Sequence, residues 1–204
     1  RTTTGAGTQT AAISGGGYTT AYVAITETYD GSSWTEVADL NTARGRAKAI
    51  GLQTAALHIG GESSIHAITE SWNGTSWTEV GDLNDGRYSA GGGGTQTSAI
   101  ASGGASAPVV GNTELWDGSS WTEVSNLNTA RYGLEVVAAD STVALAFGGT
   151  PPVKDETEEW DGSSWTEVAD LSTARVEVMG AGTQPSALAI GGNSGSVTNA
   201  TEEW

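Results

Sequence analysis

The chain lacks cysteine altogether, and it carries only 8 Lys and Arg against 24 Asp and Glu. Without cysteine there is no disulfide framework, no thiolate metal site and no cysteine nucleophile. The net charge of −16 disfavours phosphate-bearing partners, because Lys and Arg supply most of the affinity for nucleic acids. We therefore expect neither a nucleic acid nor a membrane as a partner.

Long apolar runs and catalytic constellations are also missing. No stretch approaches the roughly 18 to 20 apolar residues of a membrane-spanning helix, and residues 1–5 do not resemble a signal peptide. The two histidines, His58 and His66, lie eight residues apart with no cysteine or tyrosine constellation for copper. No strained G-x-S-x-G context supports a serine nucleophile. We expect no catalytic residues, no cofactor and no enzymatic activity.

What the chain has in abundance is repetition. Its aromatic-Asp-Gly-Ser-Ser-Trp-type segments place a tryptophan at 34, 77, 121 and 165, at intervals of 43, 44 and 44 residues. A glycine doublet recurs five times, and five of the six arginines recur in phase, at 1, 44, 87, 131 and 175. Such a period indicates a repeat architecture. The units run from about 1–43, 44–86, 87–130, 131–174 and 175–204 (partial), within a single domain spanning 1–204.

Each unit reads as four short strands. Apolar runs such as 98–102 and 143–147 end at a glycine, and Asp-Gly-Ser-Ser between two aromatic residues is typical of a hairpin turn. No window sustains the periodicity of an amphipathic helix. The sequence therefore predicts an all-β, five-bladed β-propeller of four-stranded antiparallel blades, the last blade lacking its outer strand.

These motifs resemble kelch-type β-propeller repeats. The resemblance lies in the glycine doublet, the aromatic that ends the third strand, the spacing of Trp34, Val37 and Leu40, and the arginine that opens the next unit at Arg44. The period of about 44 is shorter than the roughly 50 residues of kelch repeats. WD40 repeats are the alternative, since Trp-Asp pairs occur at 116–117 and 160–161, although the Gly-His element is missing. The amino-acid sequence of the units is also similar to repeats of bacteriophage and aquatic bacterial surface proteins. This resemblance implies a virion, extracellular or cell-surface location.

The hairpin predicts which side chains face one another. If residues 30–33 form the turn, Tyr29 pairs with Trp34, and two glutamates stand opposite each other in every full unit. Because facing like charges are unfavourable, three explanations stay open: an arginine of an adjoining blade or water bridges the pair, calcium binds it, or the register is different. The calcium candidates are Glu27, Glu36, Glu70, Glu79, Glu114, Glu123, Glu158 and Glu167.

Other recurring residues are interpreted as structural. We expect Arg44, Arg87, Arg131 and Arg175 to be partly buried anchors, and Trp34, Trp77, Trp121 and Trp165 to pack between blades. The turn aspartate is expected to cap its own turn. It departs from the Asp box of sialidase-type propellers because Gly31 follows Asp30 directly. His58 is expected to be a packed blade residue. Glycine in the innermost strands predicts close backbone approach.

Function is expected on the loops that vary between units. The segments after the glycine doublets differ from unit to unit, at 18–26, 62–69, 105–113, 150–157 and 193–201. Loops on a rigid scaffold commonly carry binding residues, although unconstrained drift gives the same pattern. We expect a non-enzymatic structural, adhesive or binding module with a protein or glycan partner. The alternative is a carbohydrate-binding or glycan-hydrolysing propeller. The open edge at 198–204 is expected to receive a strand from about 14 residues preceding Arg1 or from a neighbouring chain.

Overall fold

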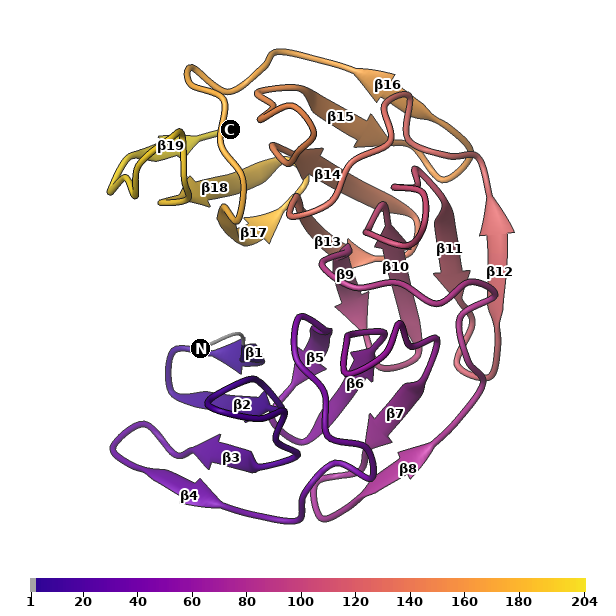
Figure 1. Cartoon of the computed structure of the whole chain (residues 1–204), viewed down its shortest axis with the longest axis vertical. Coiled ribbons are helices and arrows are strands. Elements are labelled where there is room, and N and C mark those ends of the chain that lie inside the picture. The colour runs from indigo at the N-terminus through magenta and orange to yellow at the C-terminus, as the bar shows by residue number, and fades with distance from the viewer. Residues whose placement is uncertain (1–2) are drawn as a thin grey trace. The chain divides into compact units, whose positions relative to one another are not determined.

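The computed structural model describes residues 3–204, which form strands and turns with no helix among them. Nineteen strands make five antiparallel sheets, four with four strands and the last with three. Within each sheet the strands lie in sequence order, so every connection is between neighbours (Figure 1). These sheets are the blades of a five-bladed β-propeller, and the predicted fold class is confirmed.

The blades have the following strands. The first has β1 (Thr4–Thr8), β2 (Ala11–Gly15), β3 (Thr26–Tyr29) and β4 (Trp34–Glu36); the second has β5 (Lys48–Leu52), β6 (Ala55–Ile59), β7 (Thr69–Trp72) and β8 (Trp77–Glu79). The third has β9 (Gly91–Thr95), β10 (Ser98–Ser102), β11 (Thr113–Trp116) and β12 (Trp121–Val124). The fourth has β13 (Glu135–Asp140), β14 (Val143–Phe147), β15 (Thr157–Trp160) and β16 (Trp165–Glu167). The last has β17 (Met179–Thr183), β18 (Ser186–Ile190) and β19 (Thr201–Glu203).

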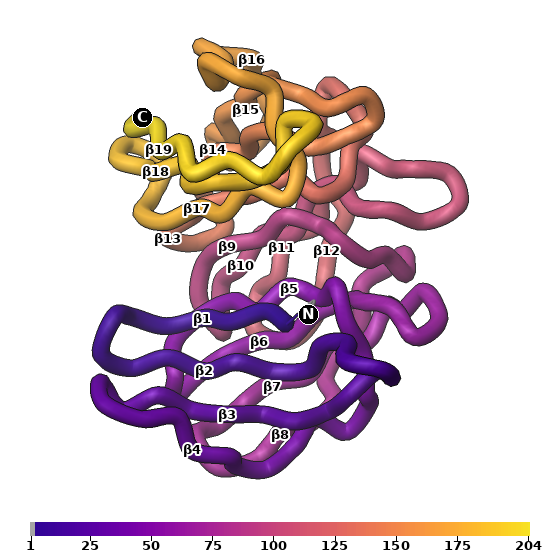
Figure 2. The backbone as a smooth tube through the Cα atoms, turned by 60° about the vertical axis from the view of Figure 1, so that its left-hand side comes forward, coloured from indigo at the N-terminus to yellow at the C-terminus, as the bar shows by residue number. Residues whose placement is uncertain are grey.

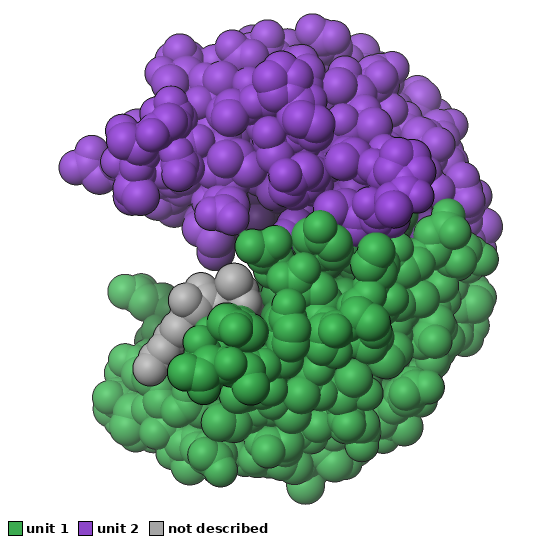
Figure 3. All heavy atoms as spheres, in the orientation of Figure 1, with its two compact units in different colours: residues 1–88, 95–98, 116–121 green, residues 89–94, 99–115, 122–204 purple. Residues whose placement is uncertain are grey.

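The chain divides into two compact units (Figure 3). One contains residues 1–88, 95–98 and 116–121, which are the first two blades and the turns at one end of the third. The other contains residues 89–94, 99–115 and 122–204, which are the rest of the third blade and the last two. Both units are built from the same blade, and neighbouring blades inside a unit meet through the same contacts.

The hairpin register is as expected from the turn. In the first blade, whose four strands lie side by side in Figure 2, Tyr29 pairs with Trp34 and Glu27 with Glu36. The same pairing recurs between β7 and β8 and between β15 and β16. The paired aromatic rings lie 5.2–5.5 Å apart in all four complete blades. The explanation that relied on a different register is therefore wrong.

Glycine and alanine in the innermost strands reflect close contact between neighbouring blades. A Cβ added to Gly93 would lie 2.7 Å from the backbone nitrogen of Ala138 in β13, and one on Gly91 would lie 2.5 Å from Val136. A Cβ on Gly180 would lie 2.6 Å from Glu135. Because no larger residue fits at these distances, the predicted close approach is confirmed for these strands.

The core is divided among the spaces between adjacent blades. One cluster joins Ile13 and Leu40 of the first blade to Ala56, Trp72 and Trp77 of the second. A second cluster joins the third and fourth blades, and a third joins the fourth and the last. The buried apolar surface described by these clusters therefore lies between neighbouring sheets.

Candidate functional site

The glycine doublets and the recurring arginines meet at one junction between blades. The second glycine of each of the first four doublets donates its N–H to the carbonyl of the next arginine, at 2.8–2.9 Å, as Gly17 does to Arg44. The first glycine has φ of 61–68°, and a Cβ there would lie 2.4–2.6 Å from that same carbonyl oxygen. Only glycine suits this position, because its left-handed backbone and the close carbonyl both exclude a side chain. The two motifs are therefore one structural device.

In the second and fourth blades, the side chain of the recurring arginine neutralises one glutamate of the facing pair. Arg44 Nη1 donates to Glu70 Oε1 at 2.5 Å, and Arg131 Nη1 donates to Glu158 Oε1 at 2.7 Å, with all four side chains buried. Arg175 forms the corresponding ion pair with Glu202. Each arginine belongs to the same repeat unit as its glutamate, so the expected donor from an adjoining blade is wrong. Burial lowers the pKa of Arg44, while the charge of Glu70 opposes that shift.

This pairing leaves little for a metal ion to bind. The second oxygen of Glu70 accepts the backbone N–H and the side-chain amide of Asn41, both at 2.7 Å. Glu158 does the same with Asn128. Residues 3–204 contain no group of three or more acidic or histidine side chains placed to hold a metal ion. Glu70 and Glu158 therefore each accept hydrogen bonds from an arginine and an asparagine at the junction between blades.

A threonine–tryptophan contact is the second recurring junction, and the sequence-based reasoning missed it. The indole N–H of Trp77 donates to Thr26 Oγ1 at 3.1 Å, Trp121 to Thr69 at 3.0 Å, and Trp165 to Thr113 at 2.9 Å. In each case the outer-strand tryptophan of one blade reaches the first residue of the third strand of the preceding blade. The signal was present, since threonine recurs at 26, 69, 113, 157 and 201.

Asparagine completes this junction. The side-chain amides of Asn41, Asn84 and Asn128 donate to the backbone carbonyls of Trp77, Trp121 and Trp165 at 3.1–3.3 Å. Trp77, Trp121 and Trp165 are only 5–7% exposed, but Trp34 of the first blade is 49% exposed. Three of the four predicted packing tryptophans are therefore buried between blades, and Trp34 is not.

The turn aspartates cap their own turns. Asp30 Oδ1 accepts the backbone N–H groups of Ser32 and Ser33, both at 2.9 Å, and the Ser32 hydroxyl at 2.7 Å. These hydrogen bonds, the Ser32 hydroxyl first, lower the pKa of Asp30 to about 2. Asp117 and Asp161 repeat the arrangement, and Asn73 replaces it with an amide oxygen. The capping role is confirmed.

The two histidines have different surroundings. His58 is buried, its Nε2 lies 3.3 Å from the Gly15 carbonyl, and its ring packs edge-on 6.0 Å from Trp77. Burial, followed by the charge of Arg44, lowers the pKa of His58 to about 3. His66 Nε2 lies 2.9 Å from the Ser63 hydroxyl in a loop. His58 is thus a packed blade residue, as expected.

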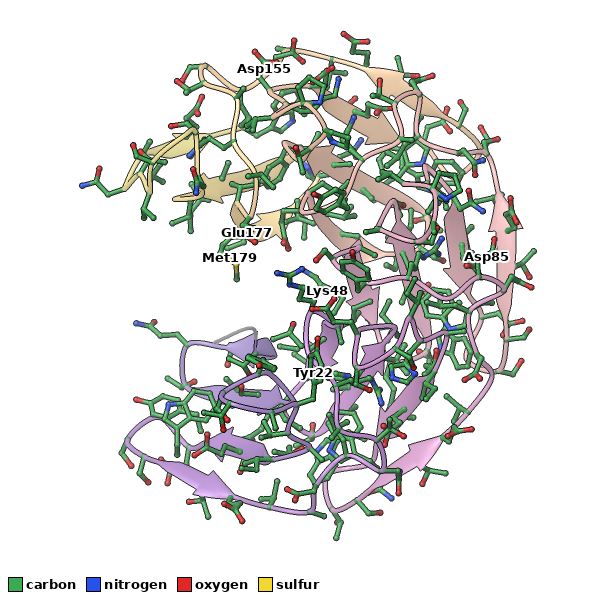
Figure 4. The ribbon with its side chains drawn as sticks, in the orientation of Figure 1. Tyr22, Lys48, Asp85, Asp155, Glu177 and Met179 are labelled. Carbon is green, nitrogen blue, oxygen red and sulfur yellow. The ribbon has the colours of Figure 1, made fainter. Side chains whose placement is uncertain are left out.

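The variable segments of the first two blades meet two side chains, Arg46 and Tyr88, that lie just after the recurring arginines. Tyr18 and Tyr22 pack edge to face at 5.1 Å, and Arg46 Nε lies 3.3 Å from Glu62 Oε1. The Arg46 guanidinium also lies 5.9 Å from the ring centre of Tyr88. The pKa of Tyr22 (labelled in Figure 4) is raised, first by desolvation and then by its hydrogen bond to Glu62. We call Tyr18, Tyr22, Arg46, Glu62 and Tyr88 the tyrosine cluster.

A shallow cleft that encloses about 600 Å³, including space open to solvent, lies beside the tyrosine cluster on the first blade. Its wall includes Tyr18 and Ile25, which are both 43% exposed, together with the polar side chains of Ser14 and Glu27. An exposed aromatic face, hydroxyl groups and one carboxylate can hold a small polar ligand by packing and hydrogen bonds.

Left-handed backbone recurs two residues after each arginine, which the sequence did not reveal. Arg46, Ser89 and Glu177 have φ of 50°, 52° and 55°, and Gly133 occupies the same place with φ of 63°. In the second compact unit the backbone N–H of Gly133 donates to Ser89 and that of Glu177 to Gly133, both at 2.8 Å. These blade-to-blade hydrogen bonds hold the left-handed backbone at Ser89, Gly133 and Glu177.

Comparison with known proteins gives no family assignment. No family model matches the chain, and no curated protein matches its sequence. No helix among the described residues is long and apolar enough to cross a membrane.

Proposed function

We propose that the protein is a non-enzymatic, kelch-like binding module that recognises its partner through the variable loops following the glycine doublets. The observation that carries this proposal is the contrast between two sets of residues. Most of the recurring glycines, arginines, asparagines and tryptophans are held at blade junctions, whereas the variable segments present exposed side chains such as Tyr18, Ile25 and Ile65 to solvent. Residues that support no blade junction are the ones left to bind a partner.

The tyrosine cluster is the part of this surface best suited to binding. Tyrosine offers a large, rigid contact area together with a polar hydroxyl, and it is enriched where proteins bind one another. Arg46 and Glu62 are held by each other, so they add charge at fixed positions. Because the protein carries a charge of −16, a neutral or basic protein surface or an uncharged glycan suits it better than an acidic partner.

We also propose an extracellular, cell-surface or virion location. The support is the similarity of the repeat sequences to repeats of bacteriophage and aquatic bacterial surface proteins.

A photo-crosslinking comparison tests the loop-face proposal. A photoreactive amino acid replaces Thr19, in the variable loop of the first blade, or Gln9, an exposed residue of the repeated turns. The probes are an array of neutral and acidic glycans and an array of purified surface proteins. We expect crosslinks from position 19, and we expect their yield to fall when Tyr18→Ala or Arg46→Ala is added. Equal crosslinking from position 9 would refute the assignment of the binding face.

The cleft beside Tyr18 favours one second candidate, which is carbohydrate binding. Aromatic faces pack against sugar rings, and Ser14 and Glu27 can hydrogen-bond their hydroxyl groups. Hydrolysis usually requires two carboxyl groups about 5 to 9.5 Å apart. Glu27 is the carboxylate among the described lining residues, so the cleft supports binding better than cleavage. The test measures binding of neutral oligosaccharides and release of reducing ends. Binding to wild type that is lost in both Tyr18→Ala and Glu27→Gln, with no reducing ends released, would establish this candidate.

A further inference from the structure

The hairpin turn of the second blade differs from the turns of the other complete blades at the position that caps it. Residues 73–76, between β7 and β8 (Figure 1), read Asn-Gly-Thr-Ser, whereas the other three turns read Asp-Gly-Ser-Ser. All four residues of this turn are exposed. The asparagine places a side-chain amide directly before a glycine, whose backbone nitrogen can approach that amide closely because glycine has no side chain.

The amide oxygen of Asn73 is held at the place where negative charge develops when the amide is attacked. Its Oδ1 accepts the backbone N–H groups of Thr75 and Ser76, both at 2.9 Å. When a nucleophile adds to the amide carbon, this oxygen takes up the charge of the tetrahedral intermediate. Fixed N–H donors stabilise such a charge, as in the oxyanion holes of enzymes. The turn therefore activates the same amide that it uses as its cap.

The nucleophile is the next backbone nitrogen in the chain. In the part of the chain that the structure describes, the N–H of Gly74 donates to no acceptor. Gly74 has φ of 91°, and a Cβ added there would lie 3.5 Å from the carbonyl oxygen of Thr54 as its nearest neighbour, so the turn is open at this residue. Because nucleophile and amide belong to adjacent residues, the reaction needs no encounter between separate molecules.

We propose that Asn73 is a modification site at which the protein deamidates itself. The Gly74 nitrogen forms a bond to Cγ of Asn73 and loses its proton to water, and the side-chain nitrogen leaves as ammonia. Water then adds to Cγ of the cyclic imide, and the bond from Cγ to the Gly74 nitrogen breaks. The net change converts one amide and one water molecule into a carboxylate and an ammonium ion, and it leaves aspartate at position 73.

The other blades show that this product fits the turn. Asp30 accepts the backbone N–H groups of Ser32 and Ser33 at 2.9 Å, the same distances as at Asn73. The Ser32 hydroxyl and these two N–H groups lower the pKa of Asp30 to about 2, so its carboxylate is ionised at neutral pH. An ionised carboxylate resists attack, because attack would place a second negative charge beside the first. The reaction therefore ends at aspartate.

The hairpin also selects between the two possible products. Water that adds to the other carbonyl of the imide gives isoaspartate, which inserts an extra methylene into the main chain. This insertion lengthens the turn that holds Trp72 opposite Trp77. We therefore expect aspartate to be the major product in the folded protein.

Asn193 is a matched site whose neighbouring nitrogen is engaged. Its Oδ1 accepts the backbone N–H of Gly195 at 2.9 Å, so it also caps a turn. The next residue is Ser194, whose backbone N–H donates to the carbonyl of Ser196 at 3.2 Å. We expect Asn193 to remain intact while Asn73 reacts.

Mass spectrometry of the whole chain tests the proposal. The protein is kept near neutral pH, either folded in buffer or unfolded in guanidinium chloride, and its peptides are sequenced over time. We expect deamidation at Asn73 to be about threefold to tenfold faster in the folded chain, because only the folded turn places two N–H donors on the amide oxygen. In water enriched in heavy oxygen, the new aspartate should carry one solvent oxygen. Asp117→Asn creates the same Asn-Gly pair under the N–H groups of Ser119 and Ser120, and it should add a second reacting site.

The same samples can contradict the proposal. Deamidation of Asn73 that is equally fast or slower in the folded chain would overturn it, because the turn would then protect the amide. Equal deamidation of Asn193 would also overturn it, since an unengaged nitrogen would then be unimportant. A majority of isoaspartate in the folded chain, or an Asn73→Asp variant that unfolds at a lower denaturant concentration than wild type, would show that the turn does not accept the product.

Discussion

The buried histidine of the second blade makes stability depend on pH. His58 has a folded-state pKa of about 3, against about 6.5 in an unfolded chain, because burial and the Arg44 charge both disfavour the imidazolium. Below about pH 6.5 the unfolded chain binds a proton that the folded protein does not. Stability is therefore fully present above that pH and falls as the pH drops toward 3.

The magnitude follows from the separation of the two pKa values. Each pH unit inside the window costs about 1.4 kcal/mol, so acidification from about pH 6.5 to pH 5 removes about 2 kcal/mol of unfolding free energy. Carboxyl groups titrate mainly below this range, near pH 4. The histidine effect is consequently separable from general acid denaturation.

Urea unfolding between about pH 7 and pH 5 measures this slope. His58→Ala is the matched variant, since Ala101, Ala146 and Ala189 occupy the same place in later blades. We expect the variant to be less stable than wild type at pH 7, because a cavity opens beside Trp77, but to lose much less stability on acidification. His66→Ala is the loop control. The same slope in wild type and His58→Ala would refute the reasoning.

Three further predictions follow from the junctions and turns. Arg131→Ala should lower the unfolding free energy, measured by chemical denaturation, by about 3–5 kcal/mol because it leaves the buried Glu158 without its ion-pair partner. Adding Glu158→Ala to this variant should recover part of the loss. Lys154→Ala, at the more exposed Lys154–Glu156 pair, should cost at most about 1 kcal/mol. Trp165→Phe should cost about 1–2 kcal/mol by losing the bond to Thr113, and Trp34→Phe should stay within about 0.5 kcal/mol; equal effects would contradict the junction assignment. Asp117→Asn should preserve the turn, as Asn73 does, and should abolish the fall in stability that wild type shows as the pH drops from about 4 toward the folded pKa of Asp117, about 2. Asp117→Ala should destabilise the protein at neutral pH. Identical melting curves for the two variants would show that the cap is unimportant.

The repeat, the strands and the hairpin register could be read from the sequence because their causes are local. Four turn residues place Tyr29 opposite Trp34 and Glu27 opposite Glu36, whatever lies elsewhere in the chain. The capping role of Asp30 is equally local, since its hydrogen-bond partners are two and three residues away. Because the repeat period is fixed, the strands and turns predicted for one unit apply to the others, and the number of units gives the number of blades.

Which recurring residues contact one another could be known only from the tertiary structure. Trp77 and Thr26 are 51 residues apart, and nothing in either local segment indicates that the indole of one blade enters the preceding blade. The same holds for the choice of Glu70 over Glu79 by Arg44, which depends on which carboxylate the packed sheets bury.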